Sequence, residues 1–443
     1  MTASEVRPAE KAAPSPLVSP HPERAVGVAS PGPRAPRGGI RSLRTFESFH
    51  DPTFRWFFLA MLGQMAAMNS QMLVRGWLTY DLTGSYADLG LVAVASATPM
   101  LFLSMIGGVF ADRFPKRQVL QLGQTASLLL AATMAVLLFA DVLEFWHLIT
   151  ASVVQGTIMA LMMPSRQSMI PDLVPPEQFT NAIALNAAGM NSMRLLAPGL
   201  GGIVIGLAGA SWVYLAMTAL YGFAILGLTK VPAVAPRRRD AADSRGGVSD
   251  LLDGFRYIRR TPTIFALLIA SFITSLLAMP YLHILAGYVD DVFGAGPEQL
   301  GILISLIGVG ALVGALFLAS IRDGRRGLIL LLSVTLMGVG LIGLAVVDSF
   351  YMAMPVMLVL GLGSAGRQAL SNVLIQSNVE DAYRGRVMSV YMTQFSVMSF
   401  GTFGIGLVSE VVGVQVVIGM LGITLIAVML GIMAFVPLLR RMR

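Results

Sequence analysis

The stretch "GGVFADRFPKR", residues 107–117, is a charged segment between two long apolar runs of the chain. It holds one acid, Asp112, followed by the bases Arg113, Lys116 and Arg117, whereas the residues around it are nearly all Leu, Val, Ala and Met. A short charged segment between two apolar runs is typical of a loop that joins two membrane-spanning helices. The stretch therefore predicts an all-α integral membrane protein.

Composition points the same way. Hydrophobic residues make up 55% of the 443 residues and charged residues only 12%, whereas soluble domains average about 25% charged residues. Apolar runs of about 20 residues recur after the first fifty positions, and each is long enough to cross a hydrocarbon core of about 30 Å. One large soluble core would not contain so many such runs, so a soluble protein is excluded.

Twelve membrane-spanning helices are expected, and the longest gap between them follows the sixth. We place the helices near residues 55–79, 86–110, 118–140, 146–168, 181–207, 211–230, 263–289, 299–320, 327–347, 350–373, 386–409 and 414–437. The first fifty residues are rich in Pro, Ser, Ala and Arg and offer too little apolar surface to fold. The predicted domains are a disordered cytoplasmic tail at 1–48, a six-helix half at 49–230, a cytoplasmic linker at 231–262 and a second six-helix half at 263–443.

Charge orients the helices in the membrane. Of the 31 Lys and Arg residues, all except Arg75 and Arg194 lie in the two tails, in alternate loops or at the helix ends beside them. The other loops carry acids and no Lys or Arg. By the positive-inside rule, both termini and the linker are cytoplasmic. The net charge of +7 is explained by topology and requires no nucleic-acid partner.

The two halves resemble each other. "RQSMIPDLVPPEQFTNAIALN" begins at Arg166, and "RQALSNVLIQSNVEDAYRGRVMSV" begins at Arg367, an offset of 367 − 166 = 201 residues. Repeated halves joined by a long cytoplasmic loop are the architecture of transporters that bind near the midplane and rock one half against the other.

Several segments carry a family resemblance. The charged loop resembles the signature Gly-x-x-x-Asp-Arg-x-x-x-Arg of the major facilitator superfamily, at Gly107, Gly108, Asp112, Arg113 and Arg117. "GWLTYDLTGSYADLGLV", "PSRQSMIPDLVPPEQFTNAIALN" and "RLLAPGLGG" look like the bacterial drug and siderophore exporter branch, and the last is similar to the antiporter signature, with Ala197 where Gly is usual. The resemblance covers nearly the whole chain from about residue 45. It implies a secondary active exporter of small amphipathic molecules that works by alternating access.

The charged loop predicts a latch between the halves. Gly107 and Gly108 would let another helix approach closely. Asp112 would face the positive N-terminus of a helix from the other half and pair with nearby arginines. The resemblance implies the same role: the loop fastens the cytoplasmic side in the outward-facing state, with Arg166 as a partner. The alternative is that its bases only set the topology.

A second signal is an arginine near the middle of the fifth expected helix. Arg194 would cost about 2.5 kcal/mol or more there unless it faced a partner or a water-filled cavity. Pro198 bends the helix below it, and Gly201 and Gly202 permit tight packing. These four residues predict a pivot or a substrate contact. The alternative is an arginine bound by backbone carbonyls of a neighbouring helix.

Polar stripes on three helices predict a substrate cavity. Helical spacing places the stripes on single faces, and the cavity candidates are Gln64, Gln71, Arg75, Asn186, Met190, Tyr391 and Gln394. Two alternatives remain open: Arg75 snorkels to the outer headgroups, and the stripe with Tyr391 is ordinary packing.

Proton coupling normally requires a carboxylate deep in the membrane. None of the twelve expected helices places one near its midplane. The coupling candidates are Asp88 and Glu410 at the outer rim, with His283 at similar depth, and Arg75 would alternate between Asp88 and the substrate. The alternative is that Asp88 only caps its helix.

Other chemistry is not expected. The chain has no Cys and four scattered His, which predict neither a metal site nor a disulfide. "GLGSAG", residues 361–366, lies inside an apolar helix with no strand before it, and no phosphate-binding loop is present. We therefore expect a monomer without enzyme activity or cofactor in the bacterial cytoplasmic (inner) membrane, with small molecules, protons and lipid as partners. The alternatives are a lipid or lysolipid flippase of the same fold and a non-transporting receptor or scaffold.

Overall fold

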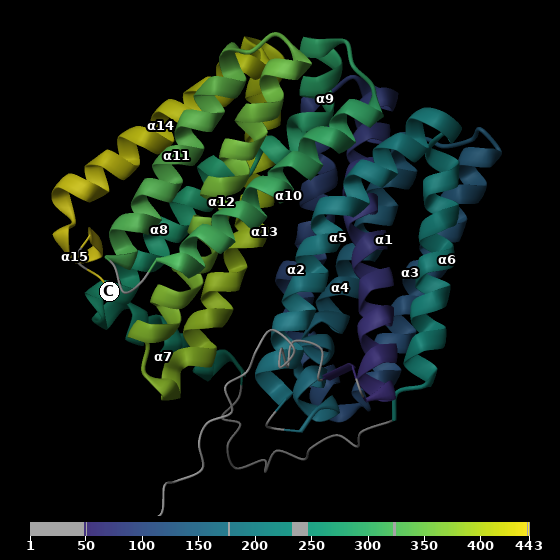
Figure 1. The fold of residues 1–443 in the computed structure, drawn as a ribbon, viewed down its shortest axis with the longest axis horizontal. Helices are drawn as coiled ribbons and strands as arrows, with labels where there is room; N and C mark the ends of the chain where they lie inside the picture. Colours follow the sequence, from purple (N-terminus) through teal and green to yellow (C-terminus); the bar gives the residue numbers. More distant parts are fainter. Residues whose placement is uncertain are drawn as a thin grey trace, which may run out of the picture. The chain divides into compact units, whose positions relative to one another are not determined.

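The computed structural model describes residues 48–49, 51–175, 178–232, 247–321, 325–440 and 442. The predicted tail, residues 1–48, lies outside these residues except for Ser48, and so does the linker from 233 to 246. The helices labelled in Figure 1 are α1 (Pro52–Thr83), α2 (Tyr86–Arg113), α3 (Lys116–Phe139), α4 (Phe145–Leu173), α5 (Phe179–Ala208), α6 (Ala210–Thr229), α7 (Gly247–Arg260), α8 (Pro262–Ala278), α9 (Tyr281–Phe293), α10 (Pro297–Ser320), α11 (Arg326–Val346), α12 (Phe350–Asn378), α13 (Asp381–Val412), α14 (Val414–Phe435) and α15 (Pro437–Arg440).

The twelve predicted membrane spans are confirmed. Within the described residues, 12 helical segments are long and apolar enough to cross a membrane, and one of them consists of α8 and α9 together. The sequence predicted a continuous helix over 263–289, but α8 ends at Ala278 and α9 begins at Tyr281. Pro280 explains the break, because proline lacks the N–H of the helical ladder and its ring clashes with the preceding turn.

Three boundaries differ from the expectation in a way that affects function. α4 extends to Leu173 and α12 to Asn378, beyond the expected ends at 168 and 373. In α4 the extra turns are held by Lys116, whose Nζ donates to the carbonyl of Ser168 at 2.7 Å and to the carboxylate of Asp172. Arg166 and Arg367 therefore lie inside helices rather than at their ends. In addition, α7 occupies part of the linker, where no helix was predicted.

Six spanning helices precede the linker and six spans follow it, so α1–α6 form one half and α8–α14 the other. The two groups of helices meet at the top of Figure 1 and separate towards the bottom. The domain boundaries at 49–230, 231–262 and 263–443 remain a prediction, because the helices alone do not locate them to the residue.

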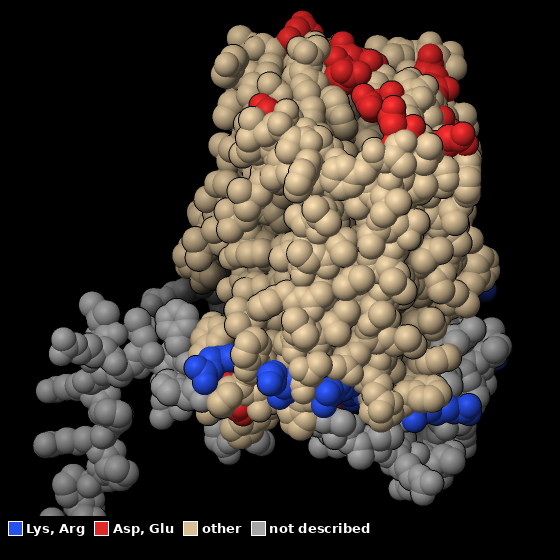
Figure 2. Space-filling model, turned by 90° about the vertical axis from the view of Figure 1, so that its right-hand side faces the viewer, with Lys and Arg blue, Asp and Glu red and all other residues tan. Residues whose placement is uncertain are grey.

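Charged residues divide between the two ends of the bundle. On the face shown in Figure 2, Asp and Glu gather at the top and Lys and Arg at the bottom. We call these the acidic end, with Asp81, Asp141, Glu144, Asp290, Asp291, Glu298, Asp348 and Glu410, and the basic end, with Arg113, Lys116, Arg117, Lys230, Arg256, Arg259, Arg325 and Arg326. The positive-inside rule assigns the basic end to the cytoplasm.

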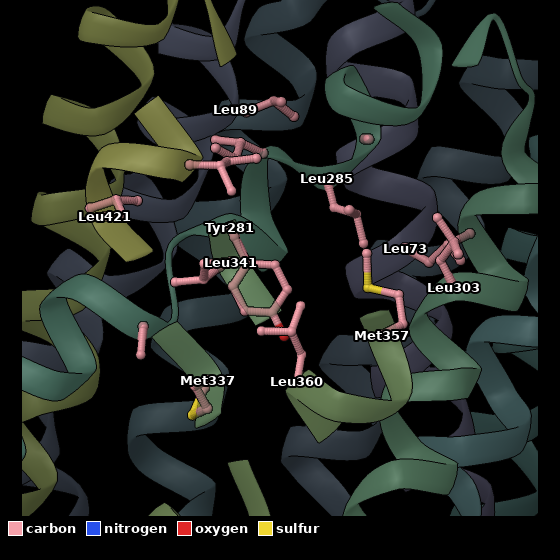
Figure 3. Close-up of a cluster of buried hydrophobic side chains, with 14 of the residues drawn as sticks. Leu73, Leu89, Tyr281, Leu285, Leu303, Met337, Leu341, Met357, Leu360 and Leu421 are labelled. Carbon is pink, nitrogen blue, oxygen red and sulfur yellow. The ribbon is translucent and has the colours of Figure 1, made fainter. Parts of the chain in front are cut away.

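The halves pack closely against each other at the acidic end. A Cβ added at Gly90 of α2 would collide with the backbone of Phe403 in α13, and one at Gly202 of α5 with the carbonyl of Pro297 in α10. Buried apolar side chains of both halves, including Leu73 and Leu303, form one cluster (Figure 3). Glycine allows backbones to approach within a membrane bundle, where packing rather than the hydrophobic effect drives association.

Candidate functional site

A cavity of about 270 Å³ lies between the two halves. α1, α2 and α4 line it from one half, and α9, α10 and α13 line it from the other. Most of the lining is apolar, and its polar members are Gln71, Arg75, Ser96, Gln155, His283, Ser396 and Ser399. A largely apolar pocket with a few convergent polar groups is the usual form of a small-molecule site.

Two of the predicted cavity residues, Gln71 and Arg75, line this cavity. Arg75 is only 9% exposed, and its Nε and Nη2 atoms have no hydrogen-bond partner in the structure. Tyr214 and Tyr221 of α6 interact with it electrostatically. The guanidinium thus points into the protein, which does not favour the snorkelling alternative.

The other predicted cavity residues of the N-terminal half lie apart from this cavity. Gln64 is buried and donates from Nε2 to the sulfur of Met162 at 3.5 Å. Asn186 and Met190 come together with Arg166, because the Met190 sulfur accepts from Asn186 Nδ2 at 3.6 Å and from Arg166 Nη2 at 3.7 Å. Arg166 therefore belongs to a polar group inside the N-terminal half.

Tyr391 and Gln394 of α13 surround an arginine that the sequence analysis did not single out as a site residue. Arg367 is 3% exposed, and its Nη1 donates to Ser275 Oγ at 3.2 Å, while Ser275 Oγ donates to Gln394 Oε1 at 2.7 Å. Tyr391 interacts electrostatically with Arg367. The signal for this residue was the repeat that aligns Arg367 with Arg166.

The predicted latch is described only in part, since the side chains of Gly108 and Asp112 lie outside the described residues. A Cβ at Gly107 would collide with the carbonyl of Ala160 in α4, so this glycine allows α2 and α4 to pack within one half. Arg113 is exposed and Arg117 half-buried. Arg166 is 5% exposed and contacts the sulfurs of Met65 and Met190 rather than this loop.

The predicted pivot residues all lie on α5, between α1 and α10. Arg194 Nη1 donates to Gln368 Oε1 of α12 at 3.3 Å, which joins the two halves. Pro198 lies inside the helix, and its carbonyl is the atom that a Cβ at Gly301 would meet. Gly201 faces Ser70 of α1, and Gly202 faces α10. α5 is thus packed on both sides through small residues.

The coupling candidates have different surroundings at the acidic end. Glu410 of α13 accepts hydrogen bonds from Ser85 Oγ at 2.5 Å and from the backbone N–H of Ala87 at 3.1 Å, so it caps the N-terminus of α2 across the two halves. Asp88 lies in the first turn of α2 and takes part in neither of the two ion pairs found among the described residues. His283 lines the cavity.

One further carboxylate at the acidic end proves to be structural. Asp291 lies in α9, and its Oδ2 accepts hydrogen bonds from Tyr80 Oη at 2.7 Å and Tyr86 Oη at 2.8 Å. Tyr80 and Tyr86 belong to the N-terminal half. Asp291 therefore fastens the halves at the acidic end, and the only sequence signal was the pair of tyrosines beside the first outer loop.

Two six-helix halves around a central cavity define a transporter of the major facilitator fold. The structure is similar to the nucleoside transporter NupG, with a TM-score of 0.71 and 15% identity over 87% of this chain and 99% of that one. It is also similar to a peptide-family (POT) transporter in complex with 5-aminolevulinic acid, with a TM-score of 0.71 and 13% identity over 87% of this chain and 96% of that one.

The family follows from the sequence match. Residues 43–442 match the transmembrane secretion effector family, and the chain belongs to it. It is 26% identical to the staphyloferrin A transporter of Staphylococcus aureus over 76% of this chain and 85% of that protein. It is 24% identical to the enterobactin exporter EntS of Escherichia coli, over 77% and 82%, and 25% identical to the multidrug efflux pump Tap of Mycolicibacterium fortuitum, over 71% and 78%. The chain is therefore a multi-pass membrane transporter and not an enzyme.

Proposed function

We propose that this transporter exports small amphipathic molecules of the siderophore or drug type across a bacterial inner membrane by alternating access. The observation that carries the proposal is the central cavity, which is lined by both halves and lies below contacts that close the acidic end. A substrate between two halves can be released on the opposite side when the contacts at one end break and those at the other end form. The curated relatives include exporters of a siderophore and of drugs.

The proposal includes proton coupling at the acidic end. Glu410 holds the N-terminus of α2 through a charge-assisted hydrogen bond and through the helix dipole. A proton on this carboxylate would remove its charge and weaken the cap. Protons from outside would then favour opening of the acidic end, which is the step that releases an exported substrate.

Accumulation of a panel of siderophores and macrolides in cells with and without the chain tests the export. Cells that contain the chain should retain less of at least one compound, and an inhibitor that collapses the proton gradient should cancel the difference. Equal retention of every compound would contradict the proposal. Movement of labelled lysolipid instead would support the flippase alternative, and binding without movement would support a receptor.

A further inference from the structure

Four arginines of the described residues lie far from the ends of the helices that carry them, and three of the four are buried. Arg75, Arg166, Arg194 and Arg367 all lie well inside membrane-spanning helices. The acids of the described spans lie towards the two ends: Asp172 at the basic end, and Asp81, Asp88, Asp290, Asp291, Glu298 and Glu410 at the acidic end. Buried charges in proteins are normally paired, and an intramembrane cation marks a functional site with a partner.

None of these arginines forms an ion pair with a carboxylate of the described residues. Arg166 contacts two methionine sulfurs, which are weak acceptors, and Arg367 contacts the hydroxyl of Ser275. Buried donors remain without partners on Arg75, on Arg166 (Nη1) and on Arg367 (Nε), and also on Gln394 (Nε2). A buried donor without a partner costs its full desolvation, so a ligand that supplies acceptors would be bound strongly.

Two of the arginines come from opposite halves of the bundle. Arg194 lies on α5 and Arg367 lies on α12. The hydrogen bond from Arg194 to Gln368, the neighbour of Arg367, brings the first guanidinium to the second helix. Arg194 and Gln368 are both exposed, so the space beside them is open rather than filled by packing.

We infer that Arg194 and Arg367 together bind an anionic group of the exported molecule, and that the substrate class is organic oxyanions, carboxylates or catecholates, rather than cationic drugs. A planar guanidinium donates two parallel hydrogen bonds to such a group. The inference deepens the proposed function and rests on it.

The repeat explains why the site is asymmetric. Arg166 and Met190 stand at the same offset of 201 residues from Arg367 and Tyr391, and Arg166 contacts the Met190 sulfur within its own half. In the C-terminal half the partners are polar, whereas in the N-terminal half they are sulfurs.

An anion between the two halves would also act on the conformational step. Without it, two like charges resist the approach of α5 and α12, and this repulsion is strong where water is excluded. An anion would neutralise both guanidiniums and draw the halves together at the basic end. The substrate would then promote the closure that precedes its own export.

Thermal unfolding of the purified chain in detergent tests the binding site. The probes are citrate as a carboxylate, 2,3-dihydroxybenzoate as a catecholate and tetraphenylphosphonium as a cation. At least one anion should raise the unfolding temperature of the wild type and of Arg259→Gln, whose exposed arginine lies on α7. The cation should not. Arg194→Gln and Arg367→Gln should bind that anion at least about tenfold more weakly, as expected for loss of a charged hydrogen bond.

A second variant keeps the test valid if the arginine variants fold poorly. Gln394→Glu places a carboxylate beside Ser275 and Arg367, so it should raise the unfolding temperature without ligand and weaken anion binding at least about tenfold. Equal anion binding by all variants, stabilisation by the cation alone, or no response to either anion would each overturn the inference. Export of cationic dyes unchanged in Arg367→Gln would leave the proposed export intact and refute the anion site. Anion binding by the wild type without export of any compound would support the anion site and contradict the proposed export.

Discussion

The acidic and basic ends of the transporter are held in different ways. At the acidic end, contacts cross between the halves: Gly406 of α13 lies against the backbone of Tyr86, and Asp291 accepts from two tyrosines of the other half. At the basic end, the described contacts stay within a half. Lys116 pairs with Asp172, and Tyr257 of α7 stacks on Tyr383 of α13 with ring centroids 4.1 Å apart.

This difference indicates which interactions close the acidic end and which would close the basic end. The acidic end closes by backbone packing through glycines, to which a few hydrogen bonds are added. Closure at the basic end remains a prediction from the sequence, in which the charged loop 107–117 acts as a latch. Packing is insensitive to salt, whereas exposed charges are screened within about 10 Å at 0.1 M ionic strength. The two ends should therefore respond differently to mutation and to salt.

The largest expected effect comes from blocking the packing at the acidic end. Gly406→Leu would drive a side chain into the backbone of Tyr86 and Ala87, which cannot move aside as a flexible side chain would. Overpacking costs about 3 kcal/mol in a rigid site, so the closed form should lose about 100-fold in population. Efflux measured with membrane abundance checks this. Gly404→Leu is the matched control, because a Cβ at Gly404 meets nothing within 4 Å; equal loss in both variants would contradict the role of packing.

The second prediction concerns the hydrogen bonds to Asp291. Tyr86→Phe removes one donor to this carboxylate, and loss of a hydrogen bond to a charged group costs about 1.5–3 kcal/mol. We expect the acidic end to open at least about tenfold more often. The chain has no native cysteine, so spin labels can be attached at Leu82→Cys and Val411→Cys. These exposed residues lie on α1 and α13, so the labels report the distance between the two halves at the acidic end.

The control for Tyr86→Phe is Tyr351→Phe. This substitution removes the hydroxyl of an exposed tyrosine in the first turn of α12. The distribution of distances should broaden in Tyr86→Phe and stay unchanged in Tyr351→Phe. An unchanged distribution in both would show that packing alone closes the acidic end.

The spans could be predicted from sequence because the bilayer fixes the length and polarity of each helix. Hydropathy reports the composition of a helix but not the direction in which each side chain points. It could therefore not show that Arg367 turns towards Ser275 and Gln394. It also could not separate Asp291, which bonds two tyrosines, from the other acids of the outer loops. These contacts join residues that lie 92 to 211 positions apart along the chain, and only the packing of the whole bundle defines them.

The third prediction tests the basic end. Asp112→Asn should lower efflux several-fold with membrane abundance near normal, because a neutral side chain cannot pair with arginines or a helix N-terminus, each worth about 0.3–1 kcal/mol at an exposed site. Raising the salt concentration should lower wild-type efflux towards that of the variant. Asp253→Asn is the control, since Asp253 forms only an exposed pair with Arg256 at 4.0 Å. Wild-type efflux in Asp112→Asn would remove the latch.

The smallest expected effect concerns the cap on α2. Glu410→Gln keeps an acceptor for Ser85 and for the backbone of Ala87 but removes the charge at the helix N-terminus. A charge at this position contributes about 0.3–1 kcal/mol, so opening of the acidic end should become about two- to fivefold easier. If a proton on Glu410 drives the opening, the variant behaves as permanently protonated, and uptake into inside-out vesicles should respond less to an imposed pH gradient than in the wild type. Asp88→Asn tests the other rim carboxylate; a full response in both variants would exclude these carboxylates as coupling sites.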